Sequence, residues 1–283
     1  MNKTSLKKSC VMASMLAIAF MPLASANAAL VNRYMLNGNG TDSVGGANGT
    51  LNNPGGTASW SSTALTTTNA NATDFLSLPS TVGAGVTGDF SIEDWLTQNG
   101  SETAYTGIFS LSTSTTNFIL FNPNRNGGGT TADFEQPLVT GGGTGAETNV
   151  TTSQANFQPF GTERQIVVTY VSSTGVASIY NNGTLIGSGN IGTGFSLQSA
   201  ASGSYDGIGG GDAFADPDFN GSTDDFRIYS QALTPAQISA LNTAGPNATN
   251  AQIIAVIPEP SSLMVLLGFG ALASRRRIRR RGA

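Results

Sequence analysis

The chain has 283 residues, with 13 lysines and arginines, 17 aspartates and glutamates, one cysteine and no histidine. The absence of histidine excludes Ser-His-Asp and Cys-His catalysis, histidine zinc sites and histidine proton shuttles. Glycine, asparagine, serine and threonine are abundant and helix formers are sparse, which favours many short strands joined by tight turns.

Charge is distributed unevenly along the chain. The first 28 residues hold three of the basic side chains, and residues 275–281 hold six. The body between them, residues 29–257, has four basic and 16 acidic side chains and a formal charge of −12. Such a body repels nucleic acid and anionic membranes, and it suits cations, neutral sugars or basic partners.

The first 28 residues have the three parts of a secretion signal. A basic start is followed by an apolar run from Cys10 to Leu23 and by Ala26-Asn27-Ala28, which has the pattern of a cleavage site. The run is shorter than the ~20 residues of a spanning helix, which disfavours an uncleaved anchor. We expect a signal helix that is cleaved after Ala28, leaving a chain with no cysteine and no disulfide.

The body alternates strand patterns with turn residues. Apolar alternation and β-branched runs predict strands over 30–36, 74–78, 89–96, 106–111, 117–122, 164–171, 175–180, 184–187 and 219–230, with a weak strand near 133–135. Asn182-Gly183 lies between two of these segments and predicts a tight hairpin, because both residues tolerate positive φ.

A short helix is expected after the last strand. Thr234 can cap it, Pro235 suits its first position, and Gln237 completes a capping box. Ile238 and Leu241 then face the core, and the helix ends at Gly245. Residues 244–256 have the composition of a linker.

The segment 257–283 combines three ordered features: Pro258-Glu259-Pro260, an apolar run over Leu263–Ala273, and six arginines, namely Arg275, Arg276, Arg277, Arg279, Arg280 and Arg281. The apolar run spans a bilayer only marginally, and the arginines hold its end in the cytoplasm with the body outside.

The segment closely resembles the PEP-CTERM sorting signal of Gram-negative bacteria, and an ordinary tail anchor is the alternative. The resemblance implies processing near Pro-Glu-Pro by the membrane transpeptidase exosortase, then release or transfer to the outer surface.

Four segments of the body resemble, in order, the LamG-like jelly roll: Arg33–Leu51, Phe90–Leu96, Arg164–Gly189 and Phe219–Leu241. The resemblance implies an all-β, two-sheet antiparallel sandwich of the concanavalin A-like kind over residues 29–243, ending in one short helix. Asp94 departs from the family, which usually has a small apolar residue there. Because a lone buried carboxylate is costly, we expect Asp94 to be partly exposed and hydrogen-bonded, with a functional place on the concave face as the alternative.

Acidic residues between 206 and 225 suggest a calcium site. Asp216-Pro217-Asp218-Phe219-Asn220-Gly221 matches the start of a calcium loop, but Arg227 stands where an EF-hand needs glutamate, which excludes an EF-hand. Related sandwiches hold a calcium between the first turn and the last strand, which here implies the turn 37–42 and Asp224. The candidate Ca²⁺ ligands are Asp42, Asp216, Asp218 and Asp224, and a solvated acidic edge is the alternative.

Catalysis and sugar contacts receive weaker signals. Laminarinase-type glycosidases share the implied fold and need paired carboxylates, but here Thr131 replaces the first glutamate of their strand motif, leaving Asp133 and Glu135. Aromatic residues near predicted loops or strand ends could form sugar platforms, although large aromatics more often pack inside. They are Trp60, Tyr105, Phe121, Tyr205 and Phe214.

These expectations together describe an exported, non-catalytic surface or matrix protein whose domain binds carbohydrate. Its expected partners are exosortase and an exopolysaccharide or surface glycan, with no nucleic acid and with membrane contact only through the tail. Inner-membrane anchoring would be transient and would precede transfer to the cell surface or the medium. A purely structural matrix protein and a divergent glycosidase are the alternatives.

Overall fold

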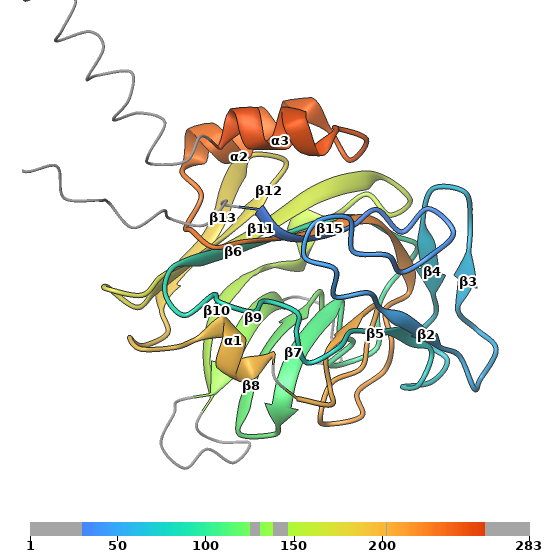
Figure 1. The fold of residues 1–283 in the computed structure, drawn as a ribbon. Coiled ribbons are helices and arrows are strands. Elements are labelled where there is room, and N and C mark those ends of the chain that lie inside the picture. The colour runs from blue at the N-terminus through green and yellow to red at the C-terminus, as the bar shows by residue number, and fades with distance from the viewer. Residues whose placement is uncertain (1–29, 125–130, 138–146, 202, 258–283) are drawn as a thin grey trace, which may run out of the picture.

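The structure is a computed structural model that describes residues 30–124, 131–137, 147–201 and 203–257. Two antiparallel sheets pack face to face, and two helices cover one of them (Figure 1). This arrangement confirms the predicted two-sheet jelly-roll sandwich. The predicted signal helix, the apolar run and the arginine cluster lie outside the described residues. Within those residues, no helix is long and apolar enough to cross a bilayer.

Sheet A, the sheet beneath the helices, contains eight strands. Its hydrogen-bonded order is β13-β12-β11-β6-β15-β4-β3, and β1 pairs with β15 on the same edge as β4. The strands are β1 (Leu30–Tyr34), β3 (Ser59–Trp60), β4 (Leu65–Thr67), β6 (Phe90–Gln98), β11 (Glu163–Val171), β12 (Val176–Asn181), β13 (Thr184–Asn190) and β15 (Gly221–Tyr229).

Sheet B contains seven strands in the order β10-β9-β8-β7-β14-β5-β2. They are β2 (Thr50–Asn52), β5 (Phe75–Ser77), β7 (Phe109–Ser114), β8 (Asn117–Asn122), β9 (Thr131–Pro137), β10 (Glu147–Ser153) and β14 (Gly207–Ile208). Two single-turn elements, η1 (Gln154–Phe157) and α1 (Leu197–Ala200), complete this half, and α1 lies against β7 and β8.

The main core lies between the two sheets. Phe90, Ile92 and Leu96 contribute to it from alternate positions of β6, and Phe109 and Phe121 meet them from sheet B. All of these side chains are buried, and the rings of Phe109 and Phe121 stack at 5.8 Å. Each buried side chain of this size contributes about 1.5–3 kcal/mol to the free energy of unfolding.

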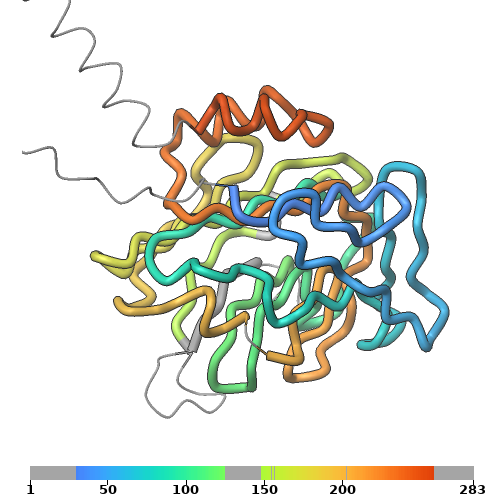
Figure 2. The backbone as a smooth tube through the Cα atoms, viewed as in Figure 1, coloured from blue at the N-terminus to red at the C-terminus, as the bar shows by residue number. Residues whose placement is uncertain are grey.

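A second core lies on the outer face of sheet A. Here α2 (Pro235–Ala244) and α3 (Asn250–Val256) lie above the sheet, as the orange and red turns of Figure 2 show. Ile238, Leu241 and Ile253 from these helices pack with sheet residues that include Val167 and Tyr229. Because this layer covers the sheet, polar side chains on that face of β6 and β15 become buried.

The structure differs from the predicted linker over 244–256, because α3 occupies most of it. Thr249 caps α3 and Gln252 completes a second capping box, so two helices rather than one follow β15 in the described part of the chain. Ile253 and Ile257 are buried against the sheet, which gives the stabilisation that a helix of seven residues lacks by itself. Packed structure therefore continues to residue 257.

Local signals predicted the other details of this region well. The box of Thr234 and Gln237 at the start of α2 forms as expected, and Gly245 ends the helix with φ of 79°. Asn182 and Gly183 have φ of 48° and 78°, as a hairpin between β12 and β13 requires. Gly183 lies against α2, since a Cβ built there would come within 3.4 Å of Ser239.

Candidate functional site

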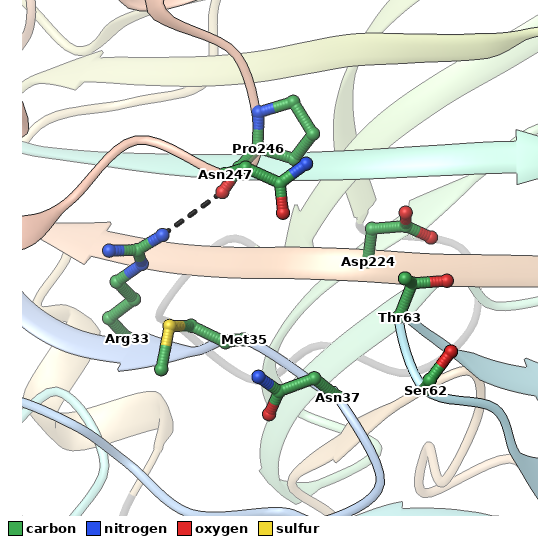
Figure 3. A pocket seen from close by; sticks show the side chains of 8 residues that line it. All are labelled: Arg33, Met35, Asn37, Ser62, Thr63, Asp224, Pro246 and Asn247. Atoms are coloured by element: carbon green, nitrogen blue, oxygen red, sulfur yellow. Dashed lines mark hydrogen bonds between the residues drawn. The ribbon is translucent and has the colours of Figure 1, made fainter.

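A small hollow of about 120 Å³ lies on the surface of the sandwich where four chain segments meet. Strand β15 pairs with β4 up to Thr223 and with β1 from Phe226 onward, which leaves a gap between the two partner strands. The turn between α2 and α3 borders this gap (Figure 3). The lining residues are Arg33, Met35, Asn37, Ser62, Thr63, Asp224, Pro246 and Asn247.

Asp224 faces the hollow because β15 has a bulge at this point. The pairing with β6 shifts register between Thr223 and Asp225, so Asp224 is an extra residue without a partner position on β6. Partial burial, followed by a hydrogen bond with Glu163 and the charge of Asp225, raises the pKa of Asp224 to about 7. Its carboxyl group therefore titrates near neutral pH and can either donate or accept a hydrogen bond.

Arg33 forms one wall of the hollow, but its charge is already matched. Its guanidinium holds Asp225 through contacts of 2.7–3.1 Å, and it also donates to Asn250 Oδ1 at 2.7 Å. A further bond of 3.0 Å reaches the carbonyl of Pro246 (Figure 3). With this positive charge neutralised, Asp224 determines the charge of the hollow.

The remaining lining groups are small and mostly neutral. Asn37 and Asn247 supply amides, Ser62 and Thr63 supply hydroxyl groups, and Figure 3 shows Thr63 beside Asp224. Met35 is 39% exposed and provides an apolar surface next to these polar groups. The hollow therefore offers several hydrogen-bond donors and acceptors around one carboxyl group and one thioether.

Asp42 does not take part in this site, although it was a candidate calcium ligand. Its Oδ1 accepts from the backbone N–H groups of Arg33, Val44 and Gly45, and its Oδ2 accepts from Ala47 and from Asn32 Nδ2, all within 3.0 Å. Burial acts to raise the pKa of Asp42, but these donors hold the pKa below its usual range. A carboxylate surrounded by N–H donors organises the turn and has no oxygen free for a cation.

Asp216 and Asp218 are likewise separated from Asp224. Asp218 is fully buried, and its Oδ2 accepts from the backbone N–H of Asp74 at 2.7 Å. The backbone N–H of Asp216 donates to Asp212 Oδ1 at 3.2 Å. In the described part of the chain, no three acidic residues are placed to hold a metal ion together. The four candidate ligands thus do not form one site, and calcium binding stays a prediction.

Asp94 overturns the expectation of a partly exposed, hydrogen-bonded carboxyl group. It is 1% exposed, and neither of its oxygens has a hydrogen-bond partner among the described residues. It pairs with Ile166 on β11 and with Phe226 on β15, in the middle of sheet A. Burial, followed by the charges of Asp224 and Asp225, raises the pKa of Asp94 well above its usual range.

A buried ionic network under the helices was not foreseen from the sequence. Arg227 contacts Glu93 Oε2 at 3.1 Å and Asp225 Oδ2 at 2.6 Å, and none of the three side chains is more than 1% exposed. Burial acts to lower the pKa of Arg227, but the two carboxylates raise it above its usual range. Glu93 also accepts hydrogen bonds from Trp95, Gln165 and Tyr229.

The network fastens the helical layer to the sheet. Arg227 donates to the carbonyls of Gly245 and Pro246 at 3.1 Å, and Arg33 reaches Pro246 and Asn250. Charged residues at outward positions of neighbouring strands are ordinarily solvated. The covering helices bury this pair, and residues 244–256, which include α3, had the composition of a linker.

The candidate catalytic carboxylates lie on one strand, and the candidate sugar-stacking residues come from several segments. Asp133 and Glu135 occupy alternate positions of β9, where they pair with Asn122 and Leu120 of β8. Phe121 is buried in the main core, Trp60 packs against that core, and Phe214 meets the ring of Phe118 edge-on. Tyr105 and Tyr205 are 45% and 43% exposed.

The sequence and the fold match known proteins. Residues 43–239 match the family model of the concanavalin A-like lectin/glucanases superfamily, and residues 256–281 match the PEP-CTERM protein-sorting motif. No curated protein matches the chain.

Two similar solved structures illustrate the fold. One is domain 4 of AbnA, an extracellular arabinanase from Geobacillus stearothermophilus, in complex with arabinotriose; it is 22% identical, with 75% of this chain and 98% of that chain covered and a TM-score of 0.54. The other is the binding domain of botulinum neurotoxin DC in complex with SialylT, 14% identical, with 76% and 51% covered and a TM-score of 0.51. The chain thus spans about half of the neurotoxin domain, and at these identities the likeness shows the fold alone.

The family match extends over most of the chain and includes β4 and β15, two of the three strands that border the hollow, whereas β1 precedes it. The motif match begins at Val256, the last residue of α3. The chain belongs to the concanavalin A-like lectin/glucanases superfamily and carries a PEP-CTERM protein-sorting motif behind its folded domain.

Proposed function

We propose that this protein is an exported, non-catalytic binding module for neutral carbohydrate, and that exosortase processes its tail. The observation that carries the binding part is the hollow around Asp224, where amides, hydroxyl groups and one carboxyl group converge. Such a lining can donate to and accept from the hydroxyl groups of a sugar ring, and exposed Met35 offers an apolar contact for its C–H face.

The size of the hollow fits partial enclosure of one sugar unit. Pockets that enclose drug-sized ligands have volumes of about 300–1,000 Å³, well above the 120 Å³ found here. A sugar bound at this site would keep most of its surface exposed, and the rest of a polysaccharide could continue across the domain. Weak binding of each unit is expected, with multivalent attachment to a polymer supplying the avidity.

Charge favours a neutral sugar. The body has a formal charge of −12, and Arg33, the cation at the hollow, is paired with Asp225. A uronic or sialic acid would therefore meet repulsion from Asp224 and from the field of the body. Arabinotriose, which is bound to domain 4 of AbnA, is a neutral oligosaccharide of the proposed kind.

The binding proposal is tested by titrating the exported chain with neutral oligosaccharides, arabinotriose among them, by calorimetry. Asn37→Ala and Asp224→Ala should each weaken binding about tenfold, since each removes a hydrogen-bonding group worth about 1.4 kcal/mol. Asn99→Ala is the matched control, because Asn99 is an exposed asparagine away from the hollow. The affinity of the Asn99→Ala variant for the oligosaccharide should equal that of the unchanged chain.

Three outcomes would contradict the proposal. No binding to any neutral or acidic glycan would favour the structural matrix protein instead. Release of reducing sugar from a β-glucan would favour the glycosidase, and Glu135→Gln should then abolish that release. Binding that survives both hollow variants would place the ligand elsewhere on the domain.

The sorting motif supports the proposal for export. Its Pro258-Glu259-Pro260 element, apolar run and arginines form the order that the motif requires, and its presence implies export and a surface or membrane-associated location. We propose that the arginines hold the tail end in the cytoplasm, that the domain faces outward, and that exosortase then acts near Pro-Glu-Pro. Mass spectrometry of the exported chain, with and without exosortase, tests the processing step.

A further inference from the structure

The last residue that the structure describes lies directly before the Pro-Glu-Pro element of the sorting motif. Ile257 is 1% exposed and belongs to the core under the helices, and Pro258-Glu259-Pro260 follows it at once. Five residues, 258–262, separate Ile257 from the apolar run. At ~3.3–3.6 Å per residue, the link between them reaches about 20 Å at most.

That reach is shorter than the domain is wide. A domain of about 230 residues has a radius of gyration near 17 Å, which corresponds to a width of roughly 40 Å. The far side of the sandwich therefore cannot turn toward a bilayer that holds the apolar run. The face that carries Ile257, which is formed by α2 and α3, is instead held within reach of that bilayer.

The same face lacks charge, although the rest of the body is strongly acidic. No charged residue occurs between Arg227 and Glu259, a span that includes both helices. None occurs between Arg164 and Asp206 either, and this span includes the hairpin of β12 and β13, whose Gly183 lies against α2. The helices and the hairpin therefore form one uncharged face.

This face also exposes apolar side chains. Leu185 on β13 is 52% exposed and Ile254 on α3 is 41% exposed. An uncharged surface with exposed aliphatic groups avoids the repulsion that an acidic surface meets at anionic lipid, and it gains from apolar contact.

We infer that the face made of α2, α3 and the β12–β13 hairpin is a membrane-contacting surface that rests on the lipid headgroups while the tail lies in the bilayer. The inference rests on the proposed anchoring of the tail. It gives the uncharged helical layer a role that sugar binding does not need. The hollow at Asp224 borders this layer at Pro246 and Asn247, so release of the tail would also free the approach to the hollow.

The test uses the chain with its tail intact, in a Cys10→Ser background that leaves no other cysteine. Ala251→Cys and Ala255→Cys place a fluorescent label on α3, and Ala84→Cys places it near α1 on the side of sheet B. All three alanines are exposed. The chains are reconstituted into vesicles of phosphatidylcholine and phosphatidylglycerol that carry a headgroup quencher.

Labels at 251 and 255 should be quenched about threefold more than the label at 84, because the short link holds α3 within reach of the headgroups. Ala251→Glu should remove the excess quenching of a label at 255, whereas Ala84→Glu should leave it unchanged. Equal quenching at all three positions would overturn the proposal. A difference in quenching that appears only when exosortase is present would also overturn it, since the partner of α3 would then be the enzyme.

Vesicle flotation separates this inference from the anchoring on which it rests. Chains that float with vesicles but show equal quenching contradict only the membrane-contacting surface. Chains that fail to float contradict tail anchoring and the surface together.

Discussion

Arg227 and Glu93 face each other directly across β15 and β6, at 3.1 Å, with neither side chain exposed to solvent. A charge pair in this position makes the helical layer and sheet A dependent on each other, because the helices keep water from the pair and the arginine binds the turn between them. The two charges stabilise the arrangement only as long as both are present.

Arg227→Met should lower the free energy of unfolding by about 3–5 kcal/mol, because Glu93 and Asp225 would lose a buried cationic partner. Urea denaturation followed by tryptophan fluorescence measures the change, since Trp95 lies in the same network. Arg227→Lys keeps the charge but cannot contact Glu93 and Asp225 with separate guanidinium nitrogens, so it should lower the free energy of unfolding by a smaller amount. A loss below about 1 kcal/mol for Arg227→Met would show that the pair is solvated.

Asp94→Ala should stabilise the domain. The substitution removes a buried carboxyl group that lacks a partner among the described residues, a defect that costs about 1–3 kcal/mol. Because burial raises the pKa of Asp94, the unfolded chain loses this proton at a lower pH than the native chain does, so the gain should grow as pH rises above about 4. Thermal denaturation at pH 5 and pH 7.5 checks both parts. Destabilisation at both pH values would mean that Asp94 has a partner in solution.

The whole domain should be more stable at pH 5 than at pH 7.5. Burial raises the pKa of Glu102 to about 8 and the pKa values of Asp206 and Asp218 to about 7. Between pH 4 and these values the unfolded chain binds fewer protons than the native chain, so stability falls by up to about 1.4 kcal/mol per pH unit for each group.

The free energy of unfolding, measured across this pH range, tests that expectation. Asp206→Asn keeps an oxygen that can accept from the backbone of Ser112, yet it removes one titrating group. The variant should therefore show a shallower decline than the unchanged chain. Stability that rises from pH 5 to pH 7.5 would contradict the native protonation of these groups.

Asn250→Ala should loosen α3 while leaving the sandwich intact. The change removes a 2.7 Å hydrogen bond from the guanidinium of Arg33, and bonds to charged groups contribute about 1.5–3 kcal/mol. Hydrogen exchange should speed up in α3 and remain unchanged in β6. Thr249→Ala, which removes only the helix cap, should have the smaller effect of about 1 kcal/mol. Equal acceleration in both elements would mean that the helices and the sheet unfold together.

Replacing the six arginines of residues 275–281 with asparagine should abolish the orientation of the tail. These side chains are the positive charge that follows the apolar run, and charge of this kind sets which end remains in the cytoplasm. Protease protection of a carboxy-terminal tag in whole cells measures the orientation. Asp224→Asn is a suitable control, since it changes one charge of the body and none in the tail.

The sequence by itself determined the features that depend on neighbouring residues. Period-two patterns identified the long strands, Asn182-Gly183 identified the hairpin, and Thr234 with Gln237 identified the start of α2. A second box at Thr249 and Gln252 carried the same signal for α3. The composition of residues 244–256 nevertheless favoured a linker. A helix of seven residues needs tertiary packing to persist, and the sequence alone does not show that packing.

Only the tertiary structure decided which side chains share an environment. The gap between β1 and β4 that admits Asp224 depends on two strands meeting one edge of β15, and the burial of Asp94 depends on its neighbours in β11 and β15. A strand pattern shows which residues share a face, but long-range pairing and the layers above a sheet decide whether that face meets water. For this reason the fold and the tail could be predicted from the sequence, whereas the hollow and the ionic network could not.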